Sequence, residues 1–248
     1  MIYFVGAGPG AEDLITVRGR ELIEQAGMII YAGSLVNREH LKYAPEGCEI
    51  FDSASMTLEQ VIEAMEDGNR RGLDIVRLHT GDSSIYGAVR EQMDMLDELS
   101  IEYEVVPGVS SFCGAAASLK AEYTLPGVSQ TVIITRMAGR TPVPGKEDIA
   151  LLAEHRATMV MFLSAGLLRP LTEKLIEGGY SKESPAAIVY KATWPDEKVL
   201  RCTVGTLAET AEKNGISKTA LIIVGDFLGD KYQRSKLYHP AFSHEFRP

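Results

Sequence analysis

The chain has 248 residues, a length that allows one or two compact domains, and 45% of them are hydrophobic and 24% charged. This balance excludes disordered and fibrous proteins. The formal net charge of −9 argues against a nucleic-acid partner, because neutralising phosphates requires a basic face, and an anionic small substrate would need a local cluster of Arg or Lys.

The amino-terminal segment and the apolar runs give no sign of export or of a membrane span. Residues 1–6 lack the basic region and cleavage site of a signal peptide. The longest apolar runs are far shorter than the ~20 residues that cross a bilayer. Three widely separated cysteines, Cys48, Cys113 and Cys202, fit neither a disulfide framework nor a zinc site, so we interpret them as reduced structural residues. We therefore expect a soluble cytoplasmic protein with no membrane partner and no metal site.

Short apolar runs recur along the chain and predict β-strands. The runs are continuous rather than alternating, which is typical of strands that are buried on both faces, as in parallel sheets. The expected strands are residues 2–5, 28–31, 75–78, 103–106, 132–135, 159–163, 186–190 and 220–224.

Apolar stripes at helical spacing lie between these strands, at residues 58–65, 89–96 and 167–176. Thr57 and Gln60 form a capping box in front of the first stripe, and Pro170 fits only the first turn of the third. The alternation of strands and helices predicts an α/β fold with a mostly parallel sheet in each of two lobes. A proline-bearing stretch at 124–145 sits where a first lobe would hand over to a second, and we place the lobes at residues 1–113 and 114–248.

The first motif that could carry chemistry is the glycine-rich run Gly6–Gly10, directly after the first strand. Glycines there permit a tight turn and let a ligand approach the backbone. With Ala11 as the last element the run loosely satisfies a dinucleotide-binding pattern, but the second strand ends at residues 31–34 without the carboxylate that would hold a ribose. A phosphate-binding P-loop is excluded because no Lys-Ser or Lys-Thr follows. A purely structural turn is the alternative.

Two further motifs follow the strands at 75–78 and 103–106. Residues 79–87 combine two glycines, several hydroxyls and Asp82 at the end of the strand where α/β sheets bind ligands, although Asp82 could instead cap a following helix. Residues 106–111 lead into a helix, where Ser110 and Ser111 could cap the helix or receive a polar ligand.

These motifs, together with residues 31–36, 185–189 and 220–225, resemble the tetrapyrrole methylase family in order and spacing, so the resemblance covers nearly the whole chain. Within the family, residues 122–136 and 31–36 resemble the branch that methylates carbon 11 of precorrin-4 or its cobalt form, yielding (cobalt-)precorrin-5 in cobalamin biosynthesis. The alternative is another precorrin methyltransferase of the same family.

The resemblance implies the two-lobed tetrapyrrole methylase (class III methyltransferase) fold, with a cofactor cleft between the lobes, and a homodimer. The implied cofactor is S-adenosylmethionine, which leaves as S-adenosylhomocysteine, and the implied substrate is a small-molecule tetrapyrrole. The implied cofactor contacts are Pro9, Thr80, Gly81, Asp82, Ile85, Ser110, Ser111 and, from the second lobe, Leu163 and Ala192.

Two positions depart from the family pattern. Ala32 stands where uroporphyrinogen-methylating relatives carry an Asp thought to act in proton transfer, and Ser83 stands where a Pro is usual. No catalytic residue is therefore assigned. His79 is the one acid/base candidate, and the alternative is a packed, hydrogen-bonded histidine.

A tetrapyrrole carries several acetate and propionate groups, so an acidic protein must offer local cations. The substrate-binding candidates near the motifs are Arg90, Lys120, Arg136 and Arg140, and solvated surface charge is the alternative for each.

Three rival functions belong to other classes. A dinucleotide-dependent oxidoreductase is disfavoured by the missing ribose-binding acid, and an RNA-methylating relative by the negative charge. A tetrapyrrole carrier would bind the macrocycle with no affinity for the cofactor.

Overall fold

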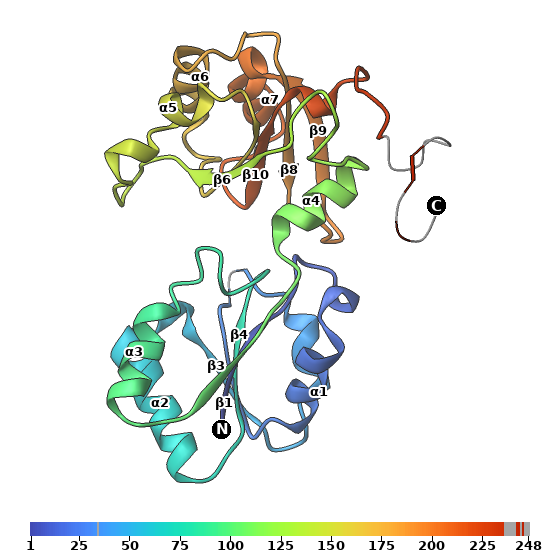
Figure 1. Cartoon of the computed structure of the whole chain (residues 1–248). Coiled ribbons are helices and arrows are strands. Elements are labelled where there is room, and N and C mark those ends of the chain that lie inside the picture. The colour runs from blue at the N-terminus through green and yellow to red at the C-terminus, as the bar shows by residue number, and fades with distance from the viewer. Residues whose placement is uncertain (34, 236–241, 244, 246–248) are drawn as a thin grey trace. The chain divides into compact units, whose positions relative to one another are not determined.

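The computed structural model describes residues 1–33, 35–235, 242, 243 and 245, so Ser34 of the motif at 31–36 lies outside the described residues. The chain divides into two compact units. The first contains Met1–Gly114 and Lys191–Asp196, and the second contains Ala115–Tyr190 and the described residues from Glu197 onward (Figure 1). The segment 191–196 therefore belongs to the first unit although it follows much of the second unit in the chain.

The first unit is built on a parallel five-stranded sheet in the order β3-β2-β4-β1-β5. Its strands are β1 (Ile2–Gly6), β2 (Met28–Tyr31), β3 (Glu49–Asp52), β4 (Ile75–His79) and β5 (Tyr103–Val106). Its helices are α1 (Val17–Gln25), α2 (Leu58–Arg70) and α3 (Arg90–Glu98), with short 3-10 helices η1 (Glu12–Leu14), η2 (Arg38–Tyr43) and η3 (Ser53–Ser55).

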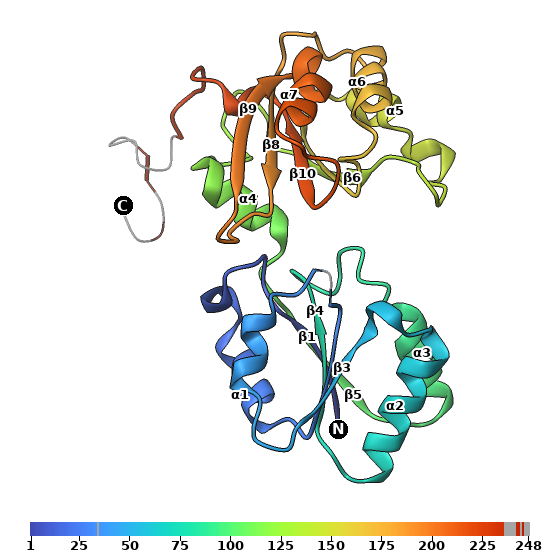
Figure 2. The ribbon, with the colours of Figure 1, turned by 180° about the vertical axis from the view of Figure 1, so that it is seen from behind.

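Helices cover both faces of this sheet (Figures 1 and 2). Successive residues of a strand point to opposite faces, so each strand packs side chains against the helices on both sides. On one face Val5 packs in a cluster with Ile23 of α1. On the other face Phe4 packs with Met65 of α2 and Leu96 of α3. All five side chains are fully buried. Continuous apolar strands are thus explained by burial on both sides.

The strand order creates a topological switch point between β1 and β4. From β1 the chain runs through α1 to β2, and from β4 it runs through α3 on the opposite face to β5. The two connections diverge, which leaves a crevice at the carboxyl ends of β1 and β4 where α/β proteins bind ligands. The loops after these strands are those singled out by the sequence motifs.

The second unit contains a mixed five-stranded sheet in the order β6-β7-β10-β8-β9. Its strands are β6 (Val132–Arg136), β7 (Thr158–Phe162), β8 (Pro185–Tyr190), β9 (Lys198–Thr203) and β10 (Ala220–Val224). Helices α5 (Ile149–Ala153), α6 (Leu168–Glu177) and α7 (Leu207–Lys213) share one hydrophobic core with β7, β8 and β10. Helix α4 (Ser111–Leu119) leads from the first unit into the second, and η4 (Gly145–Glu147), η5 (Val204–Thr206) and η6 (Asp226–Leu228) are short 3-10 turns.

The α/β class is confirmed, but the expectation of a mostly parallel sheet in each lobe is wrong for the second sheet. Only β6 and β7 pair in parallel, whereas β10 runs antiparallel to β7 and β8, and β9 runs antiparallel to β8. The segment 191–197 that joins β8 to β9 is too short for a parallel crossover, which needs about a dozen residues or more. Burial on both faces does not set strand direction.

All eight predicted strands are present, with ends within one residue, but β3 and β9 were missed. Both are edge strands, and their sequences mix polar and apolar residues. In β3, Ile50 is 45% exposed. An edge strand can do with less apolar surface, and these two carry no continuous apolar run, whereas the other two edge strands, β5 and β6, were predicted.

The three predicted helices are also confirmed as α2, α3 and α6, and Pro170 lies in the first turn of α6. The capping box is present in both directions: the Gln60 amide donates to Thr57 Oγ1 at 3.3 Å, and the Thr57 amide donates to Gln60 Oε1 at 2.9 Å. This box fixes where α2 begins and hence where its core face meets β4.

We expect Thr57→Ala to lower the free energy of unfolding by about 1 kcal/mol, because the amide of Gln60 loses its acceptor. Urea titration followed by circular dichroism measures the change. Thr57→Ser keeps the acceptor oxygen and serves as the control. An unchanged midpoint for Thr57→Ala would contradict the role of the box.

Candidate active site

Three loops meet by direct backbone contact at the carboxyl ends of β1, β4 and β5. The Ala7 amide donates to the His79 carbonyl at 2.7 Å. Gly8 and Gly81 exchange two hydrogen bonds, of 3.2 and 2.8 Å, and form an isolated antiparallel bridge. The glycine-rich loop after β1 is therefore joined to the loop after β4.

These contacts require glycine because they leave no space for a side chain. A Cβ on Gly108 would lie 2.2 Å from the Gly81 carbonyl oxygen, and one on Gly6 would lie 2.6 Å from the Gly108 Cα. Gly8 and Gly81 also have φ of +81° and +61°, a region that side chains disfavour. The three sequence motifs are thus parts of one packed structure.

Asp82 joins the second motif to the third. Its Oδ2 accepts the Gly108 amide at 2.7 Å, while Oδ1 accepts the Ser84 amide at 2.9 Å and the Ser84 hydroxyl. Burial alone would raise the pKa of Asp82, but the hydrogen bonds from Ser84 and Gly108 outweigh it and lower the pKa. Asp82 does not cap the following helix, because α3 begins only at Arg90.

The glycine-rich loop is also held from the segment 191–196. The Trp194 indole donates to the Pro9 carbonyl at 3.1 Å, and the Ala11 amide donates to Thr193 Oγ1 at 3.0 Å. The Asn37 side chain donates to the Gly10 carbonyl at 2.8 Å. Sequence reasoning missed all three side chains. Trp194 could have been noticed from the sequence because it is the one tryptophan of the chain.

The predicted cofactor residues fall into both units. Those of the first unit are Pro9, Thr80, Gly81, Asp82, Ile85, Ser110, Ser111 and Ala192, and Leu163 lies in the second. Ala192 was assigned to the second lobe, but it is buried in the segment 191–196 of the first unit.

Leu163 has features of its own at the carboxyl end of β7. It is 68% exposed and has φ of +53°. A left-handed conformation costs a non-glycine residue about 1–2 kcal/mol, and such strain collects at ligand sites. An exposed, strained leucine offers an apolar surface to a ligand.

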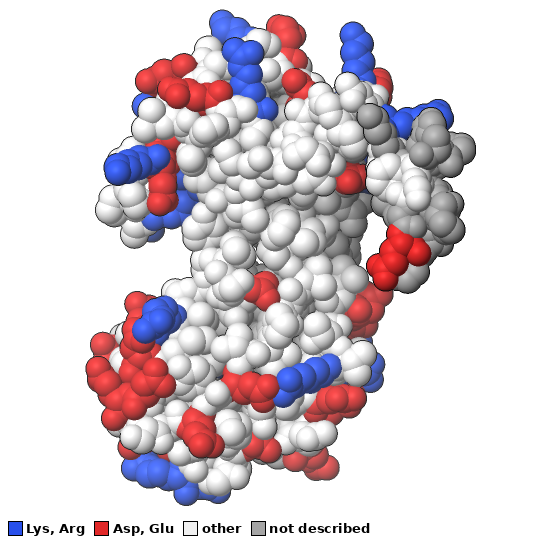
Figure 3. Space-filling model, in the orientation of Figure 1, with Lys and Arg blue, Asp and Glu red and all other residues white. Residues whose placement is uncertain are grey.

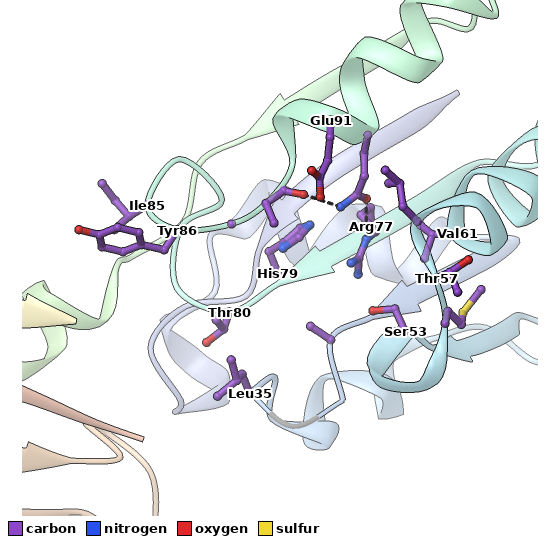
Figure 4. A pocket seen from close by; sticks show the side chains of 16 residues that line it. Leu35, Ser53, Thr57, Val61, Arg77, His79, Thr80, Ile85, Tyr86 and Glu91 are labelled. Carbon is purple, nitrogen blue, oxygen red and sulfur yellow. Dashed lines mark hydrogen bonds between the residues drawn. The ribbon is translucent and has the colours of Figure 1, made fainter. Parts of the chain in front are cut away.

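A cavity of about 260 Å³ lies beside the loop after β4, and Arg77 forms part of its wall (Figure 4). Arg77 is 6% exposed. Its Nε donates to Gln92 Oε1 at 3.0 Å and its Nη1 to the Ile30 carbonyl at 3.2 Å. Burial lowers the pKa of Arg77 to about 10, a desolvation cost of roughly 3 kcal/mol, so the side chain stays cationic at neutral pH.

His79 lines the same cavity and is 5% exposed. Its Nε2 is buried and has no hydrogen-bond partner. Burial, and then the charge of Arg77, lower the pKa of His79 to about 3. The imidazole is therefore neutral at physiological pH, which makes it a poor proton acceptor and suits it to a hydrogen bond with a ligand.

The four predicted substrate cations are divided between the two units. Arg90 is in the first unit, where it pairs with Asp94 at 2.6 Å, and Lys120, Arg136 and Arg140 are in the second. The Arg136 guanidinium donates to three carbonyls, those of Met137, Thr141 and Pro142, and thereby braces the loop after β6.

Arg77, in contrast, was missed by sequence reasoning. It lies inside a strand that was interpreted as an apolar run, and one charged residue in the middle of such a run was the signal.

Within the described ranges, no cluster of His, Cys, Asp or Glu could hold a metal ion. The helices of the described residues are all too short or too polar to cross a membrane. On the face shown in Figure 3, Lys and Arg are interspersed with Asp and Glu. On this face, the Lys and Arg side chains that bind an anionic ligand must therefore form a local cluster.

The family model of the tetrapyrrole (corrin/porphyrin) methylases matches residues 1–208. The chain belongs to the tetrapyrrole methylase family. Among curated methylases of this family, the cobalt-precorrin-4 C(11)-methyltransferase of Methanocaldococcus jannaschii is 53% identical, over 99% of this chain and 95% of that protein. The protein of the same name from Priestia megaterium is 46% identical, over 99% and 97%. The precorrin-4 C(11)-methyltransferase of Mycobacterium tuberculosis is 46% identical, over 97% and 96%.

Solved tetrapyrrole methylases have the same fold. The X-ray structure of a cobalt precorrin-4 methyltransferase of cobalamin biosynthesis is 45% identical, with a TM-score of 0.90 over 92% of this chain and 96% of that chain. The uroporphyrin-III C-methyltransferase of Thermus thermophilus in complex with S-adenosylhomocysteine is 25% identical, with a TM-score of 0.77 over 93% and 95%.

We expect Gly108→Ala to lower the free energy of unfolding by about 1–3 kcal/mol, because the new Cβ would overlap the Gly81 carbonyl. Denaturant titration measures the loss. Gly145→Ala is the matched control, since a Cβ there meets no atom within 4 Å. Equal stability of the two variants would refute the tight packing of the loops.

We expect the ring resonances of His79 to stay constant from about pH 8 to about pH 5 in NMR spectra, with His79→Gln used for assignment. An unfolded histidine titrates near about 6.5, so unfolding takes up a proton below that value. Because the pKa of His79 in the folded protein is about 3, stability is lost as pH falls from about 6.5 toward about 3, and His79→Gln lacks this contribution. Resonances that move in step with free imidazole would contradict burial of a neutral ring.

Proposed function

We propose that this protein transfers a methyl group from S-adenosylmethionine to carbon 11 of precorrin-4 or cobalt-precorrin-4, which gives (cobalt-)precorrin-5 in cobalamin biosynthesis. The observation that carries this proposal is the 53% identity, along 99% of the chain, to a protein named cobalt-precorrin-4 C(11)-methyltransferase. A relative named uroporphyrinogen-III C-methyltransferase is only 31% identical. Relatives at 46% carry both the cobalt and the metal-free name, so the proposal covers both substrates.

The residues at the ends of β1, β4 and β5 fit an adenosyl cofactor. Glycines let the three loop backbones pack directly on one another, which holds the candidate residues of these loops in fixed positions. Leu163, in the second unit, has an exposed apolar side chain. A related structure holds S-adenosylhomocysteine, which supports the same cofactor here. The residues that would hold it are Pro9, Thr80, Gly81, Asp82, Ile85, Ser110, Ser111, Leu163 and Ala192.

When bound, the cofactor supplies an electrophilic methyl group on a sulfonium. The protein's contribution is to hold the substrate carbon in line with that methyl group and to exclude water. No protein nucleophile is needed, because the pyrrolic nitrogen of the substrate can supply electrons to the attacking carbon. Ala32 lines the cavity beside His79, so this position offers no carboxylate for proton transfer. Asp82 is ionised and holds the loops in register.

The homodimer and the cytoplasmic location are further proposals, and both rest on the family resemblance.

We expect the purified protein, given S-adenosylmethionine with a carbon-13 methyl label and enzymatically prepared cobalt-precorrin-4, to add one methyl group. Mass spectrometry detects the addition, and carbon NMR locates the label on ring carbon 11. Parallel reactions with metal-free precorrin-4 decide which form is preferred. Methylation at another ring carbon, or none with either substrate, would overturn the assignment.

A further inference from the structure

The cavity beside β4 combines a cation with an unpaired hydrogen-bonding atom. Arg77 and His79 lie two residues apart on β4, so they project to the same side of the sheet (Figure 4). This is the side covered by α2 and α3, because Arg77 pairs in register with Phe4 and Ile30 of that core. Both side chains are more than nine-tenths buried and line the cavity.

The charge of Arg77 has no acidic partner among the described residues. Its two hydrogen-bond acceptors, the Gln92 side-chain amide and the Ile30 carbonyl, are neutral. Glu91 lines the same cavity, but burial alone accounts for the lowered pKa of Arg77, with no contribution from a carboxylate. A buried cation destabilises the protein unless an anion pairs with it. His79 Nε2 adds a second polar atom without a partner.

The size and walls of the cavity limit which ligand can pair with Arg77 and His79. At about 260 Å³ it is smaller than the roughly 300–1,000 Å³ of sites for drug-sized ligands, a size that suits a side chain of a macrocycle better than the ring. Ala32, Leu35 and Val61 supply apolar wall for a short methylene stem. A carboxylate at the end of that stem would meet the guanidinium and the imidazole.

The cavity also borders the cofactor candidates. Thr80 and Ile85 contribute to its wall and belong to the residues that would hold the methyl donor. A group anchored at Arg77 would therefore lie beside the donor, within the first unit.

We propose that this cavity binds one acetate or propionate carboxylate of the tetrapyrrole, with Arg77 as the ion partner and the Nε2–H of His79 as a second donor. The inference rests on the proposed function. Anchoring one peripheral carboxylate fixes the rotation of the macrocycle and so selects which ring carbon faces the methyl donor. Arg77 and His79 are thus residues that determine where the methyl group is added.

The test compares Arg77→Met with Gln92→Glu. The first removes the cation, and the second places a carboxylate at the position of the amide oxygen, 3.0 Å from Arg77 Nε, where it competes with the ligand. Both variants should raise KM for cobalt-precorrin-4 by about 10- to 100-fold, the loss of one charge-assisted contact. The dissociation constant for S-adenosylhomocysteine, measured by calorimetry, should change less than about twofold. Arg70→Met, an exposed arginine of α2, is the matched control and should leave both constants unchanged.

Gln92→Glu keeps the proposal falsifiable if Arg77→Met fails to fold, because the added carboxylate pairs with the buried cation. An unchanged KM in a folded Gln92→Glu variant would overturn the proposal and leave Arg77 a structural residue. Weakened S-adenosylhomocysteine binding with an unchanged KM would also overturn it, because the carboxylate bound would then be that of the cofactor.

A binding experiment separates this inference from the enzymatic assignment. The wild-type protein should bind a corrinoid with free acetate and propionate groups more tightly than the same ring with carboxamides, and Arg77→Met should lose that preference. Failure of wild-type methylation alone would reject the proposed function, whereas equal binding of both corrinoids by the wild type would reject the carboxylate site.

Discussion

The site depends on one constraint, the direct backbone contact between three loops at the ends of β1, β4 and β5. Gly8 pairs with Gly81, and Gly108 packs against both Gly6 and the Gly81 carbonyl. Side chains at these positions would push the loops apart. Because the contact is made by backbone atoms and their hydrogen bonds, it fixes the positions of the three loops relative to one another. Asp82 strengthens it as an ionised acceptor that spans two of the loops.

The polar residues on β4 show how a buried strand can carry function. Arg77 stands in register with the apolar Phe4 and Ile30 of the neighbouring strands, and the desolvation cost of burying Arg77 and His79 lowers both pKa values. Hydrogen bonds to neutral groups offset part of the cost for Arg77, and none offsets it for the His79 Nε2. If these two positions were only structural, apolar side chains would be more stable there. A ligand carboxylate would give Arg77 a counter-ion and His79 Nε2 a hydrogen-bond partner.

Each unit contains a five-stranded sheet, but the connections between strands differ and so do the strand directions. In the first, long crossovers through helices make every pairing parallel and bring all strand ends with motifs to one edge. In the second, a short connection between β8 and β9 and a central antiparallel β10 give a mixed sheet. The segment that joins β8 to β9 returns to the first unit, where Trp194 and Thr193 hold the glycine-rich loop.

The sequence by itself determined the α/β class, eight of the strands, the start of α2 at Thr57 and the three glycine motifs, because apolar runs, capping and turn geometry act over a few neighbouring residues. Only the tertiary structure decided the direction of β10, the edge strands β3 and β9, and the placement of Ala192. It also decided that Arg136 braces a loop while Arg77 lines a cavity. These outcomes depend on which distant segments meet, and hydrogen-bond partners and burial exist only after that meeting.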